Sequence, residues 1–310
     1  MTRCGAMALS RSSAKREPCL SHCAHGVAAR YIAPMRFALS TAQHKTTLDR
    51  LDASWQVADE LDVFESAWLF DHFYPLFTAP TEPCLEGWTA LAMLLARTSR
   101  IRGALLVSAM PYRHPAVLAN MIATIDIASA GRLEIGLGAG WFEDECKAYG
   151  IELGTLRQRF DRFDEGLEVI DSLLTKERTS FTGSYYQLVD ALVIPKALQQ
   201  PRPPICIGGQ GEQRTLRAVA RWADHWNAPA LDAEAFARKL EVLHRHCADI
   251  GRDPSTILVS NLVRYDGTDA VLEQIERFDD LGVDLLLVSV PSPHNPDDVA
   301  RLAELLAGVS

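Results

Sequence analysis

One histidine in this chain is suited to moving protons. His72 lies in the stretch WLFDHF (68–73), directly after a short apolar run that predicts a strand. Imidazole accepts or donates a proton near neutral pH, so this residue type suits a reaction in which a proton and a hydride move together. Asp71, next to it, is placed to hold the ring or a backbone group. The alternative is purely structural: an aspartate that caps a helix, beside a packed histidine.

Two glycine-rich loops each follow a predicted buried strand. The first is GLGAGWF (136–142), and the second is GGQG (208–211), which precedes a predicted helix. The first loop fails as a dinucleotide fingerprint, because Trp141 or Glu143 occupies the position of its third small residue. In the second loop, successive backbone N–H groups at a helix N-terminus are suited to binding phosphate. A tight turn without a ligand is the alternative for both loops.

A wider pattern surrounds the first loop. The segments YRHP (112–115), GRLE (131–134) and GLGAGWF (136–142) occur in this order within 31 residues. Their wording and spacing resemble the signature of the luciferase-like monooxygenase superfamily, and within it the branch that uses the deazaflavin coenzyme F-420. The resemblance covers Met35 to about Val290.

The resemblance implies a catalytic role for His72, with Asp71 beside it. The DHF motif is similar to the one in which deazaflavin-dependent sugar-phosphate dehydrogenases keep their catalytic histidine. Those enzymes place a Trp close after this motif, where this chain has Leu76. They also carry a catalytic Glu after the glycine loop, where this chain has Trp141. The resemblance therefore does not extend to a sugar-phosphate substrate.

The resemblance also implies which residues hold the cofactor. In the family, the loop after the fifth strand binds the ribityl phosphate, and the third strand carries a bulged cis non-proline peptide behind the flavin, expected here at Leu105–Leu106. His114 either contacts the ring system or caps the next helix. The expected cofactor-binding residues are Leu105, Leu106, Ser108, His114, Gly138, Ala139, Gly140, Gly208, Gly209, Gln210 and Gly211, and Trp141 and Gln43 are expected in the substrate pocket. Glu143, Asp144 and Glu145 are expected only to stabilise the first turn of a helix.

The elements that must position these residues alternate from Met35 onward. Short apolar segments predict strands at Arg36–Thr41, Ser66–Asp71, Gly103–Ser108, Arg132–Gly138, Pro204–Ile207, His225–Asn227, Ile257–Val263 and Asp284–Val290. Helices are predicted at Leu48–Leu61, Glu86–Thr98, Pro115–Ser129, Arg157–Leu174, Glu212–Trp222, Ala233–Ile250, Ala270–Leu281 and Asp297–Leu306. Eight such pairs predict an α/β fold, a (β/α)8 TIM barrel, with residues 181–204 as a short hairpin insertion before the fifth strand. Active sites of such barrels lie at the C-terminal ends of the strands, where His72 and both glycine loops fall.

Composition narrows the class of protein. The 310 residues are 48% hydrophobic and 23% charged, as in a soluble protein with a core. A net charge of −9 and the lack of a long apolar run disfavour nucleic-acid and membrane partners. Scattered cysteines suggest reduced thiols in a cytoplasmic protein.

Residues 1–34 are basic and lack periodic apolar residues, so we expect a disordered extension or a start codon assigned too early, followed by one domain at 35–310. Cys19, His22, Cys23 and His25 match no structural zinc spacing, and no metal is expected.

The expected function is an oxidoreductase that passes a hydride between coenzyme F-420 and a small organic substrate. The alternative is a monooxygenase that uses flavin mononucleotide (FMN) and molecular oxygen, and a third option is a non-catalytic flavin-binding relative. Members of the family often form dimers, so a homodimer is one expected assembly.

Overall fold

The computed structural model describes residues 35–309, and the predicted extension at residues 1–34, with its cysteines and histidines, lies outside them. Within the described residues, one parallel sheet has the strand order β3-β2-β1-β11-β10-β9-β8-β5-β4. Its two end strands, β3 (Arg102–Leu105) and β4 (Ser108–Ala109), are consecutive pieces of one barrel strand. A parallel bridge connects Gly103 of β3 to Leu133, two residues before β5. The sheet therefore closes into the TIM barrel that the sequence predicts.

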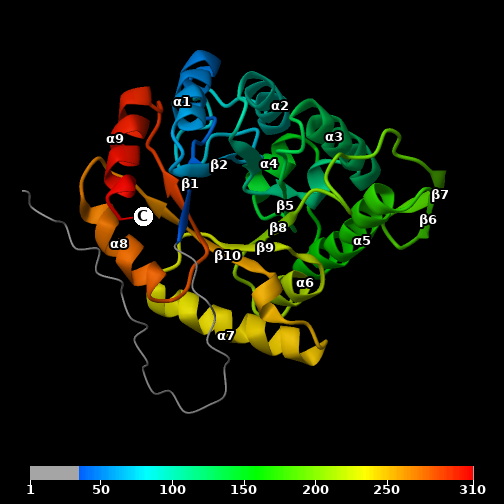
Figure 1. Ribbon diagram of the computed structural model, residues 1–310. Helices are drawn as coiled ribbons and strands as arrows, with labels where there is room; N and C mark the ends of the chain where they lie inside the picture. The colour runs from blue at the N-terminus through cyan, green and yellow to red at the C-terminus, as the bar shows by residue number, and fades with distance from the viewer. Residues whose placement is uncertain (1–34, 310) are drawn as a thin grey trace, which may run out of the picture. The chain divides into compact units, whose positions relative to one another are not determined.

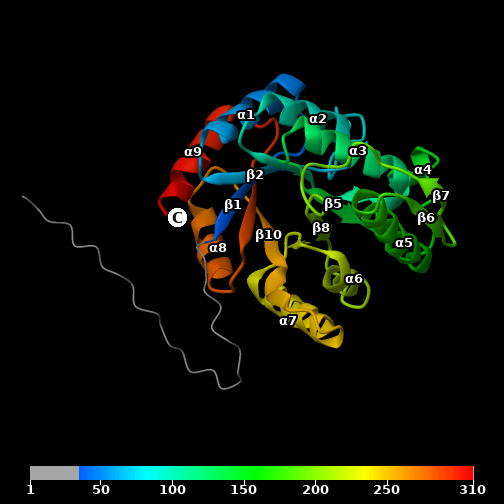
Figure 2. The same ribbon diagram turned by 45° about the vertical axis from the view of Figure 1, so that its right-hand side comes forward.

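The helices surround this barrel, as Figures 1 and 2 show from two sides. The remaining barrel strands are β1 (Arg36–Ser40), β2 (Phe64–Leu69), β5 (Ile135–Gly138), β8 (Ile205–Gly208), β9 (His225–Ala228), β10 (Leu258–Arg264) and β11 (Leu285–Ser289). The helices are α1 (Leu48–Glu60), α2 (Gly87–Arg97), α3 (Pro115–Ala128), α4 (Glu143–Ala148), α5 (Leu156–Thr175), α6 (Thr215–Trp222), α7 (Ala233–Asp249), α8 (Ala270–Asp279) and α9 (Pro296–Ala307). Each predicted strand and helix is present, because the apolar periodicity of the sequence matches the face that each element buries. Two short strands, β6 (Thr179–Thr182) and β7 (Gln187–Ala191), form the predicted hairpin before β8.

Local signals in the sequence fix where several helices begin. The Thr155 side chain accepts the N–H of Gln158, whose own side chain accepts the N–H of Thr155, so α5 starts at a capping box. Pro115 opens α3 at a position where a missing N–H has no cost. Glu86 caps α2 by accepting the N–H groups of Trp88 and Thr89. These caps place the loops that precede the helices at the mouth of the barrel.

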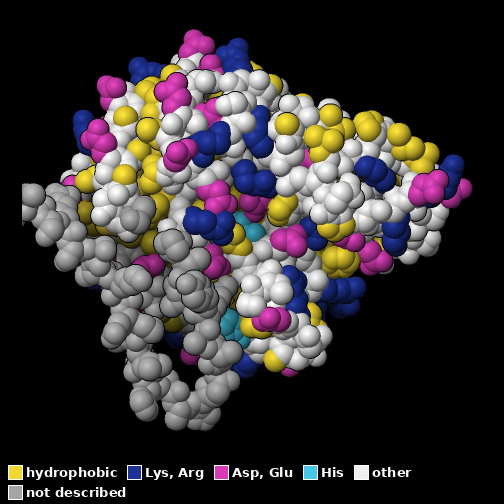
Figure 3. All heavy atoms as spheres, in the orientation of Figure 1, with side chains coloured by type: hydrophobic (Ala, Val, Ile, Leu, Met, Phe, Trp, Pro, Cys, Tyr) yellow, Lys and Arg dark blue, Asp and Glu magenta, His cyan; other side chains and the backbone are white. Residues whose placement is uncertain are grey.

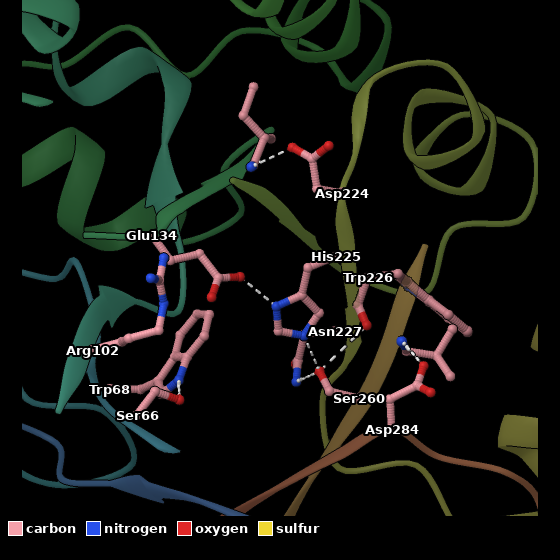
Figure 4. Close-up of polar contacts among 12 residues, drawn as sticks. Ser66, Trp68, Arg102, Glu134, Asp224, His225, Trp226, Asn227, Ser260 and Asp284 are labelled. Carbon is pink, nitrogen blue, oxygen red and sulfur yellow. Dashed lines mark hydrogen bonds and ion pairs between the residues drawn. The ribbon is translucent and has the colours of Figure 1, made fainter. Parts of the chain in front are cut away.

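Two groups of side chains, one apolar and one polar, fill the interior of the barrel. Apolar residues, among them Ala38, Trp68, Cys206 and Leu287, form one buried cluster inside the sheet. A polar network lies beside it, shown in Figure 4, where His225 stands between Glu134 and Ser260. The Nδ1 atom of His225 lies 2.5 Å from a Glu134 oxygen, and its Nε2 atom lies 2.6 Å from the Ser260 hydroxyl.

This network brings together three side chains that bind metals in other proteins. Ligand atoms of Glu134, Cys206 and His225 lie within 4.8 Å of one another. Both nitrogens of the His225 ring already make hydrogen bonds, so the ring leaves no nitrogen open to a metal ion. Burial raises the pKa of the Cys206 thiol well above its usual value, which keeps it protonated. The network is therefore best explained as a satisfied polar core of the barrel.

One side of the surface is apolar. Hydrophobic side chains gather over α3 and toward the β6–β7 hairpin (Figure 3), where Val117, Val189 and Ile194 are exposed. A hollow of about 460 Å³ lies between α2 and α3. Contiguous apolar surface of this kind is common where another protein surface packs. The homodimer expected from the sequence stays a prediction.

None of the helices in residues 35–309 combines the length and the apolar character that crossing a membrane requires.

Candidate active site

A cavity of about 950 Å³ opens at the C-terminal ends of the barrel strands. Residues at or just after the C-terminal end of each barrel strand line it, among them His44, His72, Val107, Gly140, Gly209 and His294. Cavities of this size accommodate cofactors and drug-sized molecules. Among the described residues that line it, none is Asp or Glu, whereas Lys45 and Arg264 contribute positive charge. The cavity therefore suits an anionic ligand.

His72 lies in the wall of this cavity and is almost fully buried. Its Nδ1 atom is 2.9 Å from Oε2 of Glu145, which is itself completely buried in α4. The other oxygen of Glu145 accepts the backbone N–H groups of Phe73 and Tyr74, at 2.5 and 2.8 Å. The hydroxyl of Tyr112 donates to Oε2 as well. Glu145 thus fixes the position of the His72 ring and of the backbone that follows it.

These contacts determine the charge of Glu145 and which nitrogen of a neutral His72 carries the hydrogen. Burial alone would raise the pKa of Glu145, but the hydrogen bonds from His72, Tyr112 and Tyr74 outweigh it and hold the pKa below its usual value. Glu145 is therefore an ionised acceptor, and the hydrogen of a neutral His72 sits on Nδ1. Among the residues that the structure describes, Nε2 of His72 has no hydrogen-bond partner. It offers a lone pair to a molecule in the cavity.

Asp71 was expected from the sequence to hold the His72 ring or a backbone group. It does not hold the ring. Its carboxylate pairs with Arg113, at 2.5 and 3.1 Å, and Arg113 also bonds Glu86. Burial is the larger influence and raises the pKa of Asp71 despite the Arg113 guanidinium. Asp71 is absent from the cavity wall. Its place is in a buried ion pair that ties the β2 loop to the start of α2 and to the loop before α3.

The bulge predicted in the third barrel strand is present, one residue further along. The cis non-proline bond joins Leu106 and Val107, rather than Leu105 and Leu106. Leu106 and Val107 line the cavity, whereas Leu105 is fully buried behind it. The glycines of the neighbouring strands make room for this bulge. A Cβ on Gly138 would lie 2.7 Å from the Val107 side chain, and one on Gly208 would lie 2.9 Å from it.

The second glycine loop lies at the edge of the cavity in front of α6. Gly208 and Gly209 line the cavity together with Thr215, the first residue of α6. A Cβ on Gly211 would lie 2.8 Å from the Thr215 hydroxyl, and Gly209 has a φ of +133°, which side chains rarely allow. The three glycines of this loop therefore leave space next to the buried Thr215 hydroxyl and a helix N-terminus. Such a cradle, in a cavity without acidic walls, fits the phosphate of a flavin-type cofactor.

Several other residues expected at the site do not line the cavity. Ser108 accepts a hydrogen bond from the Trp88 indole at 2.8 Å, and Gln43 clamps the backbone of Phe70 through both ends of its amide. His114 is exposed, caps α3 through its Nδ1 atom and contacts Tyr186 edge-on. Gln210 donates to the carbonyl of Pro229. Neither Gln210 nor Gly211 lines the cavity.

The first glycine loop and Trp141 lie where the sequence places them. Gly138, Ala139, Gly140 and Trp141 line the cavity. The Trp141 ring stacks on Phe142 at 5.0 Å, and both rings meet the His72 ring edge-on. Together they form an aromatic wall over the imidazole.

Three residues of this site were not predicted from the sequence. Glu145 was assigned only to the first turn of a helix, and Tyr112 and His44 received no role. Glu145 lies 73 positions from His72 along the chain, so no local spacing could join them. No signal in the sequence separates Glu145 from Glu143 and Asp144, which lie on the same helical turn and are exposed.

Known proteins resemble this chain in sequence and in structure. The F-420-dependent hydroxymycolic acid dehydrogenase of Mycobacterium tuberculosis is 34% identical over 220 residues, 71% of this chain and 59% of that protein. The F-420-dependent glucose-6-phosphate dehydrogenase of Microbacterium testaceum is 29% identical over 280 residues, 88% of this chain and 81% of that protein. The FMNH2-dependent dimethylsulfone monooxygenase of Pseudomonas putida is 31% identical over 141 residues, 46% of this chain and 38% of that protein.

Among solved structures, an F-420-dependent secondary alcohol dehydrogenase, in complex with an F-420-acetone adduct, has the same fold. It superposes with a TM-score of 0.80 at 17% identity, over 90% of this chain and all of that chain. The model of the luciferase-like monooxygenase family matches residues 31–286. The chain therefore belongs to the luciferase-like monooxygenase family of enzymes.

Proposed function

We propose that this protein is an F-420-dependent dehydrogenase that interconverts an alcohol and a carbonyl compound. Its F-420- and FMN-dependent relatives support an oxidoreductase with a cofactor of the flavin type. The observation that carries the finer proposal is His72, an imidazole in the cavity wall whose Nδ1 is fixed by a buried carboxylate and whose Nε2 is open. That arrangement suits removal of a proton from a substrate hydroxyl.

Different residues of the cavity would bind the cofactor, accept the proton and exclude water in such a reaction. When bound, the deazaflavin would supply a two-electron acceptor for a hydride. Gly208, Gly209 and Thr215 would hold its phosphate, and the bulge at Leu106–Val107 would support its ring system. His72 takes the hydroxyl proton at Nε2, while Glu145 stabilises the positive charge that forms on the ring. The aromatic wall of Trp141 and Phe142 limits access of water to the imidazole.

The FMN-dependent monooxygenase remains the second candidate, because the Pseudomonas putida relative uses reduced FMN. Oxygen chemistry needs no base on a substrate hydroxyl, so the fixed His72–Glu145 pair favours the dehydrogenase. Titration of the purified protein with F-420 and with FMN, followed by fluorescence, separates the two. We expect F-420 to bind at least tenfold more tightly.

Turnover provides the second part of this test. With F-420 under anaerobic conditions, we expect secondary alcohols to reduce the cofactor, and deuterium at the carbinol carbon to slow the reaction. Tighter binding of FMN, or consumption of oxygen during turnover, would contradict the proposal.

A further inference from the structure

His44 is a second histidine in the cavity. Its Nδ1 atom accepts a hydrogen bond, whereas the Nδ1 atom of His72 donates one. His44 follows β1 and lines the cavity. Its Nδ1 atom accepts the backbone N–H of Leu76 at 3.1 Å. A neutral imidazole has one donor and one acceptor nitrogen, so the hydrogen of His44 sits on Nε2. Among residues 35–309, no hydrogen-bond acceptor for this Nε2–H group is present.

The surroundings of His44 keep its ring neutral. Burial is the largest influence, and the neighbouring His294, Lys45 and His72 oppose a further positive charge, which lowers the pKa of His44 to about 4. The ring also meets the Phe70 ring edge-on at 5.2 Å, an apolar contact that favours the neutral form. Nε2–H is therefore a permanent donor at physiological pH.

The two histidines present complementary groups to the same space. His72 also contacts the Phe70 ring edge-on, with ring centroids 5.4 Å apart, and lines the same cavity. Glu145 fixes hydrogen on its Nδ1, so its Nε2 is an acceptor. One donor and one acceptor match a hydroxyl group, whose hydrogen points to His72 while its oxygen accepts from His44.

We propose that His44 binds the oxygen of the substrate through Nε2–H and thereby selects a hydroxyl or carbonyl substrate. This inference rests on the proposed dehydrogenase function. In alcohol oxidation, the carbinol carbon loses a hydride to the bound cofactor and the hydroxyl loses its proton to Nε2 of His72, which leaves a carbonyl. His44 exchanges no proton. In the reverse direction its neutral N–H polarises the carbonyl, as neutral imidazoles do in other enzymes.

Two substitutions separate this role from a structural one. In His44→Asn, Oδ1 takes the place of Nδ1 and still accepts the Leu76 N–H group, but the donor at Nε2 is lost. In His44→Gln, the amide Nε2 restores a donor at the distal position. With F-420 and a series of secondary alcohols from 2-propanol to 4-heptanol, we expect His44→Asn to lower kcat/KM about 100-fold, and His44→Gln to recover at least a tenth of the wild-type value. Both variants should keep the affinity for F-420.

A spectroscopic measurement tests the same assignment without turnover. In protein labelled with 15N-histidine, the signals that disappear in His44→Asn should report a neutral ring with hydrogen on Nε2 from pH 5.5 to pH 8. A protonated ring, or hydrogen on Nδ1, would overturn the inference. So would a His44→Asn enzyme within threefold of wild type, or a His44→Gln enzyme as impaired as His44→Asn. Wild-type protein that oxidises none of the alcohols would refute the dehydrogenase function, and this inference with it.

Discussion

At the scale of single residues, the imidazole of His72 has the most direct test. Replacement by alanine removes the only proton acceptor assigned to the substrate hydroxyl. We expect His72→Ala to lower turnover by about 10²- to 10⁴-fold. The affinity for F-420 should change little, because the residues proposed to hold its phosphate lie on the loop after β8. Steady-state kinetics and a fluorescence titration measure the two effects; a variant with full turnover would return His72 to a packing role.

Glu145 is predicted to act through His72, and not on the substrate itself. Glu145→Gln replaces one of its acceptor oxygens by an NH2 group, which then faces a donor from His72, Tyr112 or the backbone. We expect kcat to fall about 10- to 100-fold with little change in KM, and the melting temperature to drop by several degrees.

Tyr112→Phe is the matched control for Glu145→Gln. It removes one of the four donors to Glu145 and leaves the bond from His72 in place. Its kcat should therefore stay within about fivefold of wild type. Equal losses of kcat in the two variants would contradict a role of Glu145 in orienting His72, and would point to disruption of the whole network.

The residues also show what a sequence can and cannot reveal about a site. His72 was predicted because its motif is continuous in the chain and lies at the end of a strand. Its partner was not, because Glu145 reaches His72 only after β2, α4 and the loop before α3 are packed together. Asp71 was misplaced for the same reason. Its partner Arg113 lies 42 positions away, and adjacency to His72 suggested a contact that the backbone does not make.

At the scale of elements, the cradle before α6 can be tested without disturbing its backbone. Thr215→Val keeps the shape of the side chain and removes the hydroxyl that lines the cavity. We expect the Kd for F-420 to rise about 10- to 150-fold, which corresponds to the roughly 1.5 to 3 kcal/mol of one hydrogen bond to a charged group. The melting temperature should stay within about 2 °C.

The variant Gly209→Val is a less clean test of the same loop. Its Cβ would lie 3.1 Å from the Thr215 methyl group, at a φ of +133°. We expect it to lose stability as well as affinity. A Thr215→Val protein with unchanged affinity for F-420 would place the phosphate elsewhere.

The elements themselves were predictable from sequence, with the exception of one local detail. Periodic apolar residues and caps determine where each strand and helix runs, and these are local properties. The cis bond was placed one residue too early, because its position depends on how Val107 packs against Gly138 and Gly208 on two other strands. Contacts of this kind are not encoded by any short window.

At the scale of the whole molecule, residues 35–309 contain a complete barrel. β1 begins at Arg36 and is paired with β2 on one side and β11 on the other. We therefore expect a chain that begins at Met35 to fold with an unchanged melting temperature and F-420 affinity. A decrease of more than a few degrees, or a tenfold loss of affinity, would show that the barrel needs the preceding residues.

The cavity histidines are expected to make the stability of the whole fold depend on pH. Burial lowers the pKa of His294, and burial with nearby positive charge lowers that of His44 to about 4. In the unfolded chain both titrate near 6.5. Between these values the unfolded state binds more protons than the folded state, so the free energy of unfolding decreases as the pH falls from about 6.5 to 4.

His44→Asn removes one of these two groups, and its effect on the pH dependence can be isolated. We expect its free energy of unfolding, measured by urea titration at several pH values, to fall less steeply than that of wild type below pH 6.5. Above pH 7 the two curves should run parallel, since His44 is then neutral in the folded and in the unfolded state. Carboxylates such as Glu145 and Asp71 titrate alike in both proteins, so the difference between the curves reports His44. Parallel curves down to pH 4 would mean that His44 takes up a proton as readily in the folded state as in the unfolded state. That result would contradict the assignment of a permanent donor to this side chain.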